Sequence, residues 1–283
     1  MMRIFKNRVV LASALFALLD LIRGFVIASP ILIYLRIIYE NTESSLRLWP
    51  LPSIDIILDF LLNRNDVFMF YVITAIILSI VFFFISSFFS GGIYRLLILE
   101  RGSPESIGSG RDLLRRSAEI WTGFIKAGLF ALGVYVIAIF LGMVFGGFFG
   151  RFGPFLRIVI MAIFLLLAST YLQILRIHIA STSDTSLKAA LTETKEMISG
   201  AFGRLFVGNL SVSLAAFVAV MILWFVLKAV KSADWSINIM ILAIILQQLM
   251  VFIVCLGQSI RINFNYSVIK KGAESALGGD ELG

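Results

Sequence analysis

Three arginines recur along this 283-residue sequence at similar intervals. Arg95, Arg176 and Arg261 are separated by 81 and then 85 residues, and each lies near the end of a long apolar run. A guanidinium presents a planar fork of N–H donors that matches the oxygens of phosphate and carboxylate groups. Polar residues within membrane-spanning segments often mark function. If the fold brings the three arginines together, they predict a basic site for an anionic ligand.

Further polar side chains accompany the three arginines. The candidate ligand-binding residues are Arg95, Arg176, Arg261, Tyr94, Tyr171, Gln173, Gln258 and Asn263, with Asn265 close by in the sequence. Their convergence would form a basic vestibule at the cytoplasmic ends of three helices. The alternative is that the arginines anchor helix ends by snorkelling and that the amides form interhelical hydrogen bonds.

The sequence offers few residues for catalysis. It contains one histidine, His178, and one cysteine, Cys255, so His/Cys metal sites lack ligands and no internal disulfide can form. The Gly-x-x-x-x-Gly-Lys-Ser/Thr motif of nucleotide-binding loops does not occur. We expect no catalytic residues, no cofactor and no metal, and we expect His178 to be an ordinary interfacial histidine.

The composition indicates a membrane protein. Hydrophobic residues make up 60% of the chain and charged residues 14%, whereas soluble domains have about 45–50% and about 25%. Membrane β-barrels need alternating segments of about ten residues, and apolar runs such as 71–89 do not alternate. We therefore predict an all-α integral membrane protein with a single polytopic domain over residues 1–283.

The apolar runs predict six spanning helices in three antiparallel hairpins. The expected spans cover residues 25–38, 67–97, 119–144, 155–179, 202–230 and 237–266, and amphipathic helices are expected at 3–23, 53–62 and 185–199.

Small residues four apart let helices approach closely. They recur in two sets, Gly123, Ala127 and Ala131, and then Gly142, Gly146 and Gly150.

The first amphipathic segment allows two interpretations. Lys6, Ser13 and Asp20 are spaced by seven residues and form a thin polar stripe. We favour a helix that lies on the cytoplasmic surface, because Asp20 and Arg23 are costly near the bilayer centre. The alternative is the first half of one long spanning helix.

The polar stretch at residues 181–209 carries the clearest pattern. Ser183, Asp184 or Thr185 can cap a helix. The helical spacing predicts one face that meets the membrane or the helix bundle, formed by Leu187, Ala190, Leu191, Thr194 and Ile198. The opposite face should meet water and is formed by Lys188, Glu193, Lys195 and Glu196. We expect this surface helix to turn at Gly200 and Gly203 into the fifth span.

A fainter version of this arrangement occurs twice earlier. An acid is followed four residues later by glycine at Asp20 and Gly24, at Glu119 and Gly123, and at Glu196 and Gly200. These pairs predict a threefold structural repeat. The alternative is that helix ends at a membrane surface collect such residues without any repeat.

The basic residues predict the topology. The net charge is +7, and with the N-terminus inside, cytoplasmic segments hold 15 Lys and Arg residues and outer segments hold 7. Cytoplasmic loops of membrane proteins carry such an excess. We expect a multi-pass protein of the cell (inner) membrane with both termini cytoplasmic. Its expected partners are membrane lipids and other membrane proteins or further copies of itself, with no nucleic acid.

Two segments resemble a known group of proteins. The matching residues are Ser186, Ala190, Leu191, Gly200, Phe202, Arg204 and Leu205, and earlier Gly91, Gly92, Arg95, Arg101, Gly102 and Ser106. They resemble motifs of uncharacterised six-helix prokaryotic membrane proteins that are similar to the membrane domain of glycerophosphodiester phosphodiesterases and to related domains of unknown function. The resemblance covers roughly residues 85–215. It implies a six-helix fold and no activity, because the catalytic domain of that family is a separate soluble unit.

These observations lead to two functional hypotheses. The first is a non-enzymatic membrane protein that binds or transports a lipid-like or anionic ligand through the basic vestibule. The second is a structural subunit of a larger membrane complex, which the small-residue ladder of the third helix would join.

Overall fold

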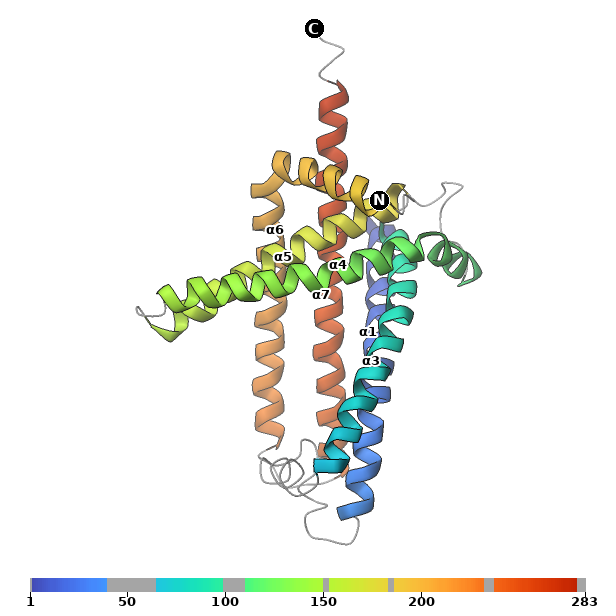
Figure 1. Cartoon of the computed structure of the whole chain (residues 1–283), viewed down its shortest axis with the longest axis vertical. Helices are drawn as coiled ribbons and strands as arrows, with labels where there is room; N and C mark the ends of the chain where they lie inside the picture. The colour runs from blue at the N-terminus through green and yellow to red at the C-terminus, as the bar shows by residue number, and fades with distance from the viewer. Residues whose placement is uncertain are drawn as a thin grey trace. The chain divides into compact units, whose positions relative to one another are not determined.

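The fold is known from a computed structural model, which describes residues 2–39, 65–98, 110–149, 153–182, 186–231 and 237–278. The elements are α1 (Met2–Tyr39), α3 (Asn65–Ile98), α4 (Gly110–Phe149), α5 (Pro154–Thr182), α6 (Leu187–Lys231) and α7 (Ile237–Gly278) (Figure 1). Each of the six contains a segment long and apolar enough to cross a membrane. The predicted all-α, six-helix membrane class is confirmed. The amphipathic helix expected at 53–62 lies outside the described residues.

Two helices extend further than expected. The third span was expected to begin at residue 119, but α4 already begins at Gly110. Its first turns are amphipathic, since Ser117 is buried while Arg111 and Arg115 are exposed, and no proline interrupts them. The sixth span was expected to end at residue 266, yet α7 continues as a helix to Gly278.

The first helix differs from the favoured interpretation. α1 is one continuous helix, so the boundary expected near Gly24 between a surface helix and a span is absent. The segment apolar enough to cross a membrane is Arg8–Pro30, which includes that boundary. Ser13, expected on a polar stripe, is fully buried and donates a hydrogen bond to the Val9 carbonyl at 2.6 Å. A single glycine costs a helix only about 1 kcal/mol relative to alanine, so Gly24 does not end α1.

The pattern of the polar stretch is confirmed in α6. Ala190 and Thr194 are fully buried, whereas Lys188, Glu193 and Lys195 are exposed. Ser186 takes the N-cap position, because its carbonyl accepts the first helical hydrogen bond from Ala190 at 3.1 Å. The expected caps, Ser183, Asp184 and Thr185, lie outside the described residues.

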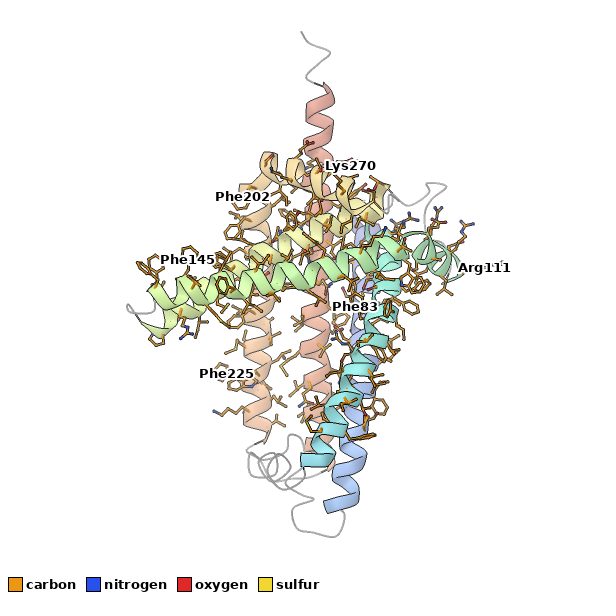
Figure 2. The ribbon with its side chains drawn as sticks, in the orientation of Figure 1. Phe83, Arg111, Phe145, Phe202, Phe225 and Lys270 are labelled. Atoms are coloured by element: carbon orange, nitrogen blue, oxygen red, sulfur yellow. The ribbon has the colours of Figure 1, made fainter. Side chains whose placement is uncertain are left out.

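α6 also bends as the glycines predicted. Figure 1 shows two arms of α6 that meet at a sharp bend, and Figure 2 labels Phe202 close to it. The helix remains continuous through the bend. Buried Ile174 of α5, Ala201 and Leu205 of α6 and Val268 of α7 form a hydrophobic cluster beside it.

The chain packs as two compact units, which are residues 18–86 and residues 1–17 with 87–283. The larger unit contains the end of α3 and all of α4 to α7. In it α4 packs against α5, α6 packs against α7, and α5 also contacts α6 and α7. The α4 and α5 pair runs across the direction of α6 and α7 (Figure 1). These two hairpins therefore cross each other, and the threefold repeat stays a prediction. The expectation of a single domain over residues 1–283 stays a prediction.

Glycines set the distance between packed helices. A Cβ added to Gly142 of α4 would lie 2.6 Å from the Met161 sulfur of α5, so part of the small-residue ladder serves this contact. A Cβ on Gly208 of α6 would overlap the Phe264 ring of α7. By contrast, a Cβ on Gly203 would meet no atom within 4 Å.

We therefore expect the substitution Gly208→Ala to lower the free energy of unfolding by about 1–3 kcal/mol, because overpacking displaces a neighbouring side chain. The matched substitution Gly203→Ala on the same helix should be neutral or stabilising by up to about 1 kcal/mol. Thermal unfolding in detergent measures both. Equal loss of stability in the two variants would contradict the close contact of Gly208 with Phe264.

Candidate functional site

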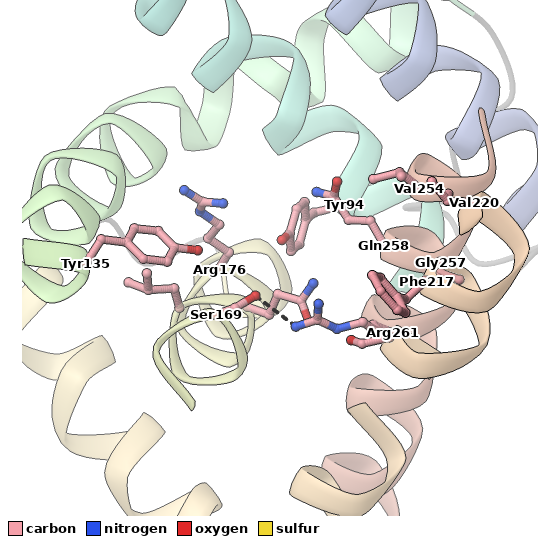
Figure 3. Close-up of a pocket in the computed structure, with 14 residues that line it drawn as sticks. Tyr94, Tyr135, Ser169, Arg176, Phe217, Val220, Val254, Gly257, Gln258 and Arg261 are labelled. Atoms are coloured by element: carbon pink, nitrogen blue, oxygen red, sulfur yellow. Dashed lines mark hydrogen bonds between the residues drawn. The ribbon is translucent and has the colours of Figure 1, made fainter. Parts of the chain in front are cut away.

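A cavity of about 450 Å³ lies within the larger unit (Figure 3). It is lined by Tyr94, Tyr135, Ser169, Leu172, Gln173, Arg176, Ser213, Ala216, Phe217, Val220, Val254, Gly257, Gln258 and Arg261. No acidic side chain is among these lining residues. Its volume falls in the range of about 300–1,000 Å³ that is typical of small-molecule sites.

Each of three helices lines the cavity with residues at the same spacing. Their lining residues are 169, 172, 173 and 176 on α5, 213, 216, 217 and 220 on α6, and 254, 257, 258 and 261 on α7. The spacing in each set is i, i+3, i+4 and i+7, which is one face of an α-helix. The α5 set carries polar residues and Arg176, whereas the α6 set is mostly apolar.

The cavity brings together five of the eight expected site residues. These are Tyr94, Gln173, Arg176, Gln258 and Arg261. Binding of a ligand by them stays a prediction. Four further polar residues at the cavity or behind its wall were not expected, namely Tyr135, Ser169, Asn209 and Ser213.

Arg261 is held by a polar network among α5, α6 and α7. Its Nε donates to Asn209 Oδ1 at 2.9 Å, and an NH2 hydrogen is donated to Ser169 Oγ at 2.8 Å. Asn209 and Asn265 are fully buried and joined by a 2.8 Å hydrogen bond, and Asn265 also donates to Gln173 Oε1 at 3.1 Å. The network orients the Arg261 guanidinium at the cavity wall. The N–H donors of this guanidinium that the network does not use are available to a ligand.

Arg176 lines the same cavity from α5 but is not part of this network. It forms no ion pair with any carboxylate of the described residues. Figure 3 shows its guanidinium between Tyr135 and Tyr94, whose hydroxyl groups point inward. The Tyr94 hydroxyl is buried without a hydrogen-bond partner in the described chain. The cavity therefore offers cationic and hydroxyl donors at one end.

Arg95 does not take part in the cavity, contrary to expectation. It is 2% exposed, its Nε donates to the Ala180 carbonyl at 3.2 Å, and it pairs with Glu119 at 2.5 Å. It thus joins the end of α3 to α4 and α5. Its neighbour Tyr94 lines the cavity because successive helical residues point about 100° apart.

Tyr171 and Asn263 are also outside the cavity. Tyr171 lines a separate, mostly apolar pocket of about 220 Å³ with Phe202 and Phe206 of α6. Asn263 lies two residues from Arg261, on another side of α7, whereas Asn265 is one turn from Arg261 and shares its face. Helical register explains why Asn265 joins the network and Asn263 does not.

His178 has a structural role in this arrangement. Its Nε2 lies 3.2 Å from Glu193 Oε2, so it joins α5 to the first arm of α6. Its Nδ1 is buried without a partner among the described residues. The single histidine lies outside the cavity, and its expected lack of a catalytic role stays a prediction.

No protein-family model, curated protein or solved structure matches the chain. The resemblance to the membrane domain of glycerophosphodiester phosphodiesterases therefore stays a prediction.

The network should be costly to interrupt. We expect Asn209→Ala to lower the free energy of unfolding by about 1–3 kcal/mol, because it leaves Arg261 and Asn265 short of buried partners. Asn263→Ala, which removes an amide outside the network, is the matched control and should change it by less than about 0.5 kcal/mol. Thermal unfolding in detergent measures both variants. An unchanged free energy of unfolding in Asn209→Ala would contradict the energetic importance of the network.

Proposed function

We propose that this protein binds an anionic, lipid-like ligand in the cavity without chemical conversion. The observation that carries the proposal is the presence of Arg176 and Arg261 in one cavity whose lining residues include no carboxylate. Unpaired charge is costly within a membrane, so a ligand with negative oxygens would relieve that cost. Charge-assisted hydrogen bonds from guanidinium groups to such oxygens are among the stronger polar contacts in proteins.

The lining residues favour binding over catalysis. The polar ones are guanidinium, amide and hydroxyl groups, and no histidine or carboxylate among them could act as a base toward a hydroxyl nucleophile. The excess of Lys and Arg in the segments assigned to the cytoplasm supports an inner-membrane location, cytoplasmic termini and access to the arginines from that side. Transport of the bound ligand would extend the same proposal.

The alternative of a structural subunit has lost its main support. It was suggested by the small-residue ladder of α4, but Gly142 and Gly146 face Met161 and Arg157 of α5 within the same chain. The described part of the ladder is therefore used for internal packing.

The proposal predicts that Arg176→Gln weakens binding of an anionic amphiphile by about ten- to a hundredfold, because a hydrogen bond to a charged group contributes about 1.5–3 kcal/mol. Arg176 is the better test than Arg261, since it is not part of the hydrogen-bonded network. Native mass spectrometry of the full chain in a neutral detergent, with added dodecyl phosphate, measures the binding.

Exposed Arg204 of α6 provides the charge-matched control. Arg204→Gln should leave the affinity for dodecyl phosphate unchanged. If Arg176→Gln and Arg204→Gln bind this probe as the unaltered chain does, the cavity is not the anion site and the proposal is wrong.

A further inference from the structure

The cavity has two ends of different chemistry. Arg176, Tyr94 and Tyr135 lie at one end, on α5, α3 and α4 (Figure 3). Phe217 and Val220 of α6 and Val254 of α7 supply an apolar wall. A small inorganic anion would use only the first set of residues. The second set requires a ligand with an apolar part.

The apolar wall continues onto the lipid-facing surface. Phe217 is 60% exposed and Val254 is 55% exposed, although both line the cavity. Both residues belong to helical segments that are apolar enough to cross a membrane. A hydrocarbon chain leaving the cavity there would remain among apolar groups and would not meet the polar surface.

The charge of the cavity lining selects among anionic headgroups. Two guanidinium groups face the cavity, and no carboxylate among its lining residues offsets them. A phosphate monoester carries a charge of about −1.5 to −2 at pH 7 and three acceptor oxygens, whereas a diester or a carboxylate carries a single negative charge. Of these three headgroups, the monoester comes closest to balancing both arginines.

The hydroxyl groups support the same choice. The hydroxyls of Tyr94 and Ser213 have no hydrogen-bond partner in the described chain, and both residues line the cavity. A buried hydroxyl without a partner costs about 1–3 kcal/mol. A headgroup with three free oxygens has acceptors for guanidinium groups and for hydroxyl groups.

We propose that the cavity binds a lipid phosphate monoester, with its phosphate between Arg176 and Arg261 and its hydrocarbon chain along Phe217 and Val254 toward the bilayer. This inference rests on the proposed function and adds the headgroup class and the orientation of the ligand. It separates a membrane lipid from free phosphate, which has the same headgroup chemistry without the chain.

The headgroup is tested by competition on the full chain in a neutral detergent. Dodecyl phosphate should bind at least about tenfold more tightly than the diester dodecyl methyl phosphate, because the diester lacks most of the second charge. Inorganic phosphate should compete weakly and in an Arg176-dependent manner. Equal affinity for monoester and diester overturns the inference, although Arg176-dependent binding of both would still support the proposed function.

The chain orientation is tested with two matched phenylalanines of α6. Phe217 lines the cavity and Phe225 does not, yet they are 60% and 59% exposed. Phe217→Ala should weaken binding of dodecyl phosphate by about tenfold, as expected from the loss of one aromatic contact with the chain, and leave the weak competition by inorganic phosphate unchanged. Phe225→Ala should have no effect on either probe.

The alternative outcomes are distinct. Equal effects of Phe217→Ala and Phe225→Ala overturn the proposed path of the chain. If no phosphate-bearing probe binds in an Arg176-dependent manner, the proposed function itself fails. Phe217→Leu replaces Phe217→Ala for the same comparison if the alanine variant is not monodisperse by size exclusion.

Discussion

A network of buried polar side chains joins neighbouring helices, and the arrangement of the larger unit depends on it. Asn209, Asn265 and Gln173 satisfy one another across α6, α7 and α5, and Arg261 adds Asn209 and Ser169 as acceptors. Asn209 also donates to the Leu205 carbonyl of its own helix at 2.7 Å, but the other bonds of the network join different helices. The network therefore fixes the register of three helices, and with it the face that each presents to the cavity.

Much of the fold could be predicted from local stretches of sequence. Bilayer thickness sets the length of a spanning helix, and the helical period sets the spacing of its buried residues. The run before Arg95 is long, apolar and free of prolines, so α3 ends within two residues of the span predicted from sequence. In the first arm of α6, the buried positions likewise follow the helical spacing of the apolar residues. The first helix was harder, because exposed Asp20 and Arg23 suggested a boundary. A helix that has already formed is not ended by two such residues, since continuing it costs little.

The candidate site was predictable only in part, because the sequence shows which residues are polar but not which way they point. Arg95, Arg176 and Arg261 all lie near the ends of long apolar runs. Arg95, however, forms an ion pair with Glu119 and donates a hydrogen bond to the Ala180 carbonyl. Nothing local distinguishes the three, since the difference lies in neighbours up to 85 residues away. The i, i+4 relation of Arg261 to Asn265 was a signal in the sequence, and it would have favoured Asn265 over Asn263. The contribution of Tyr135 depends on how α4 crosses the unit, which periodicity does not encode.

The bend of α6 has a mechanical consequence. Because the helix is continuous from Leu187 to Lys231, no flexible connection separates its amphipathic arm from its apolar part. Asn209 lies about two and a half helical turns beyond Gly200, at 3.6 residues per turn. A force that tilts the arm, such as a change in the lateral pressure of the lipids around it, is carried by an unbroken hydrogen-bonded backbone to the residue that holds Arg261. A tilt of the arm would therefore move the wall of the cavity.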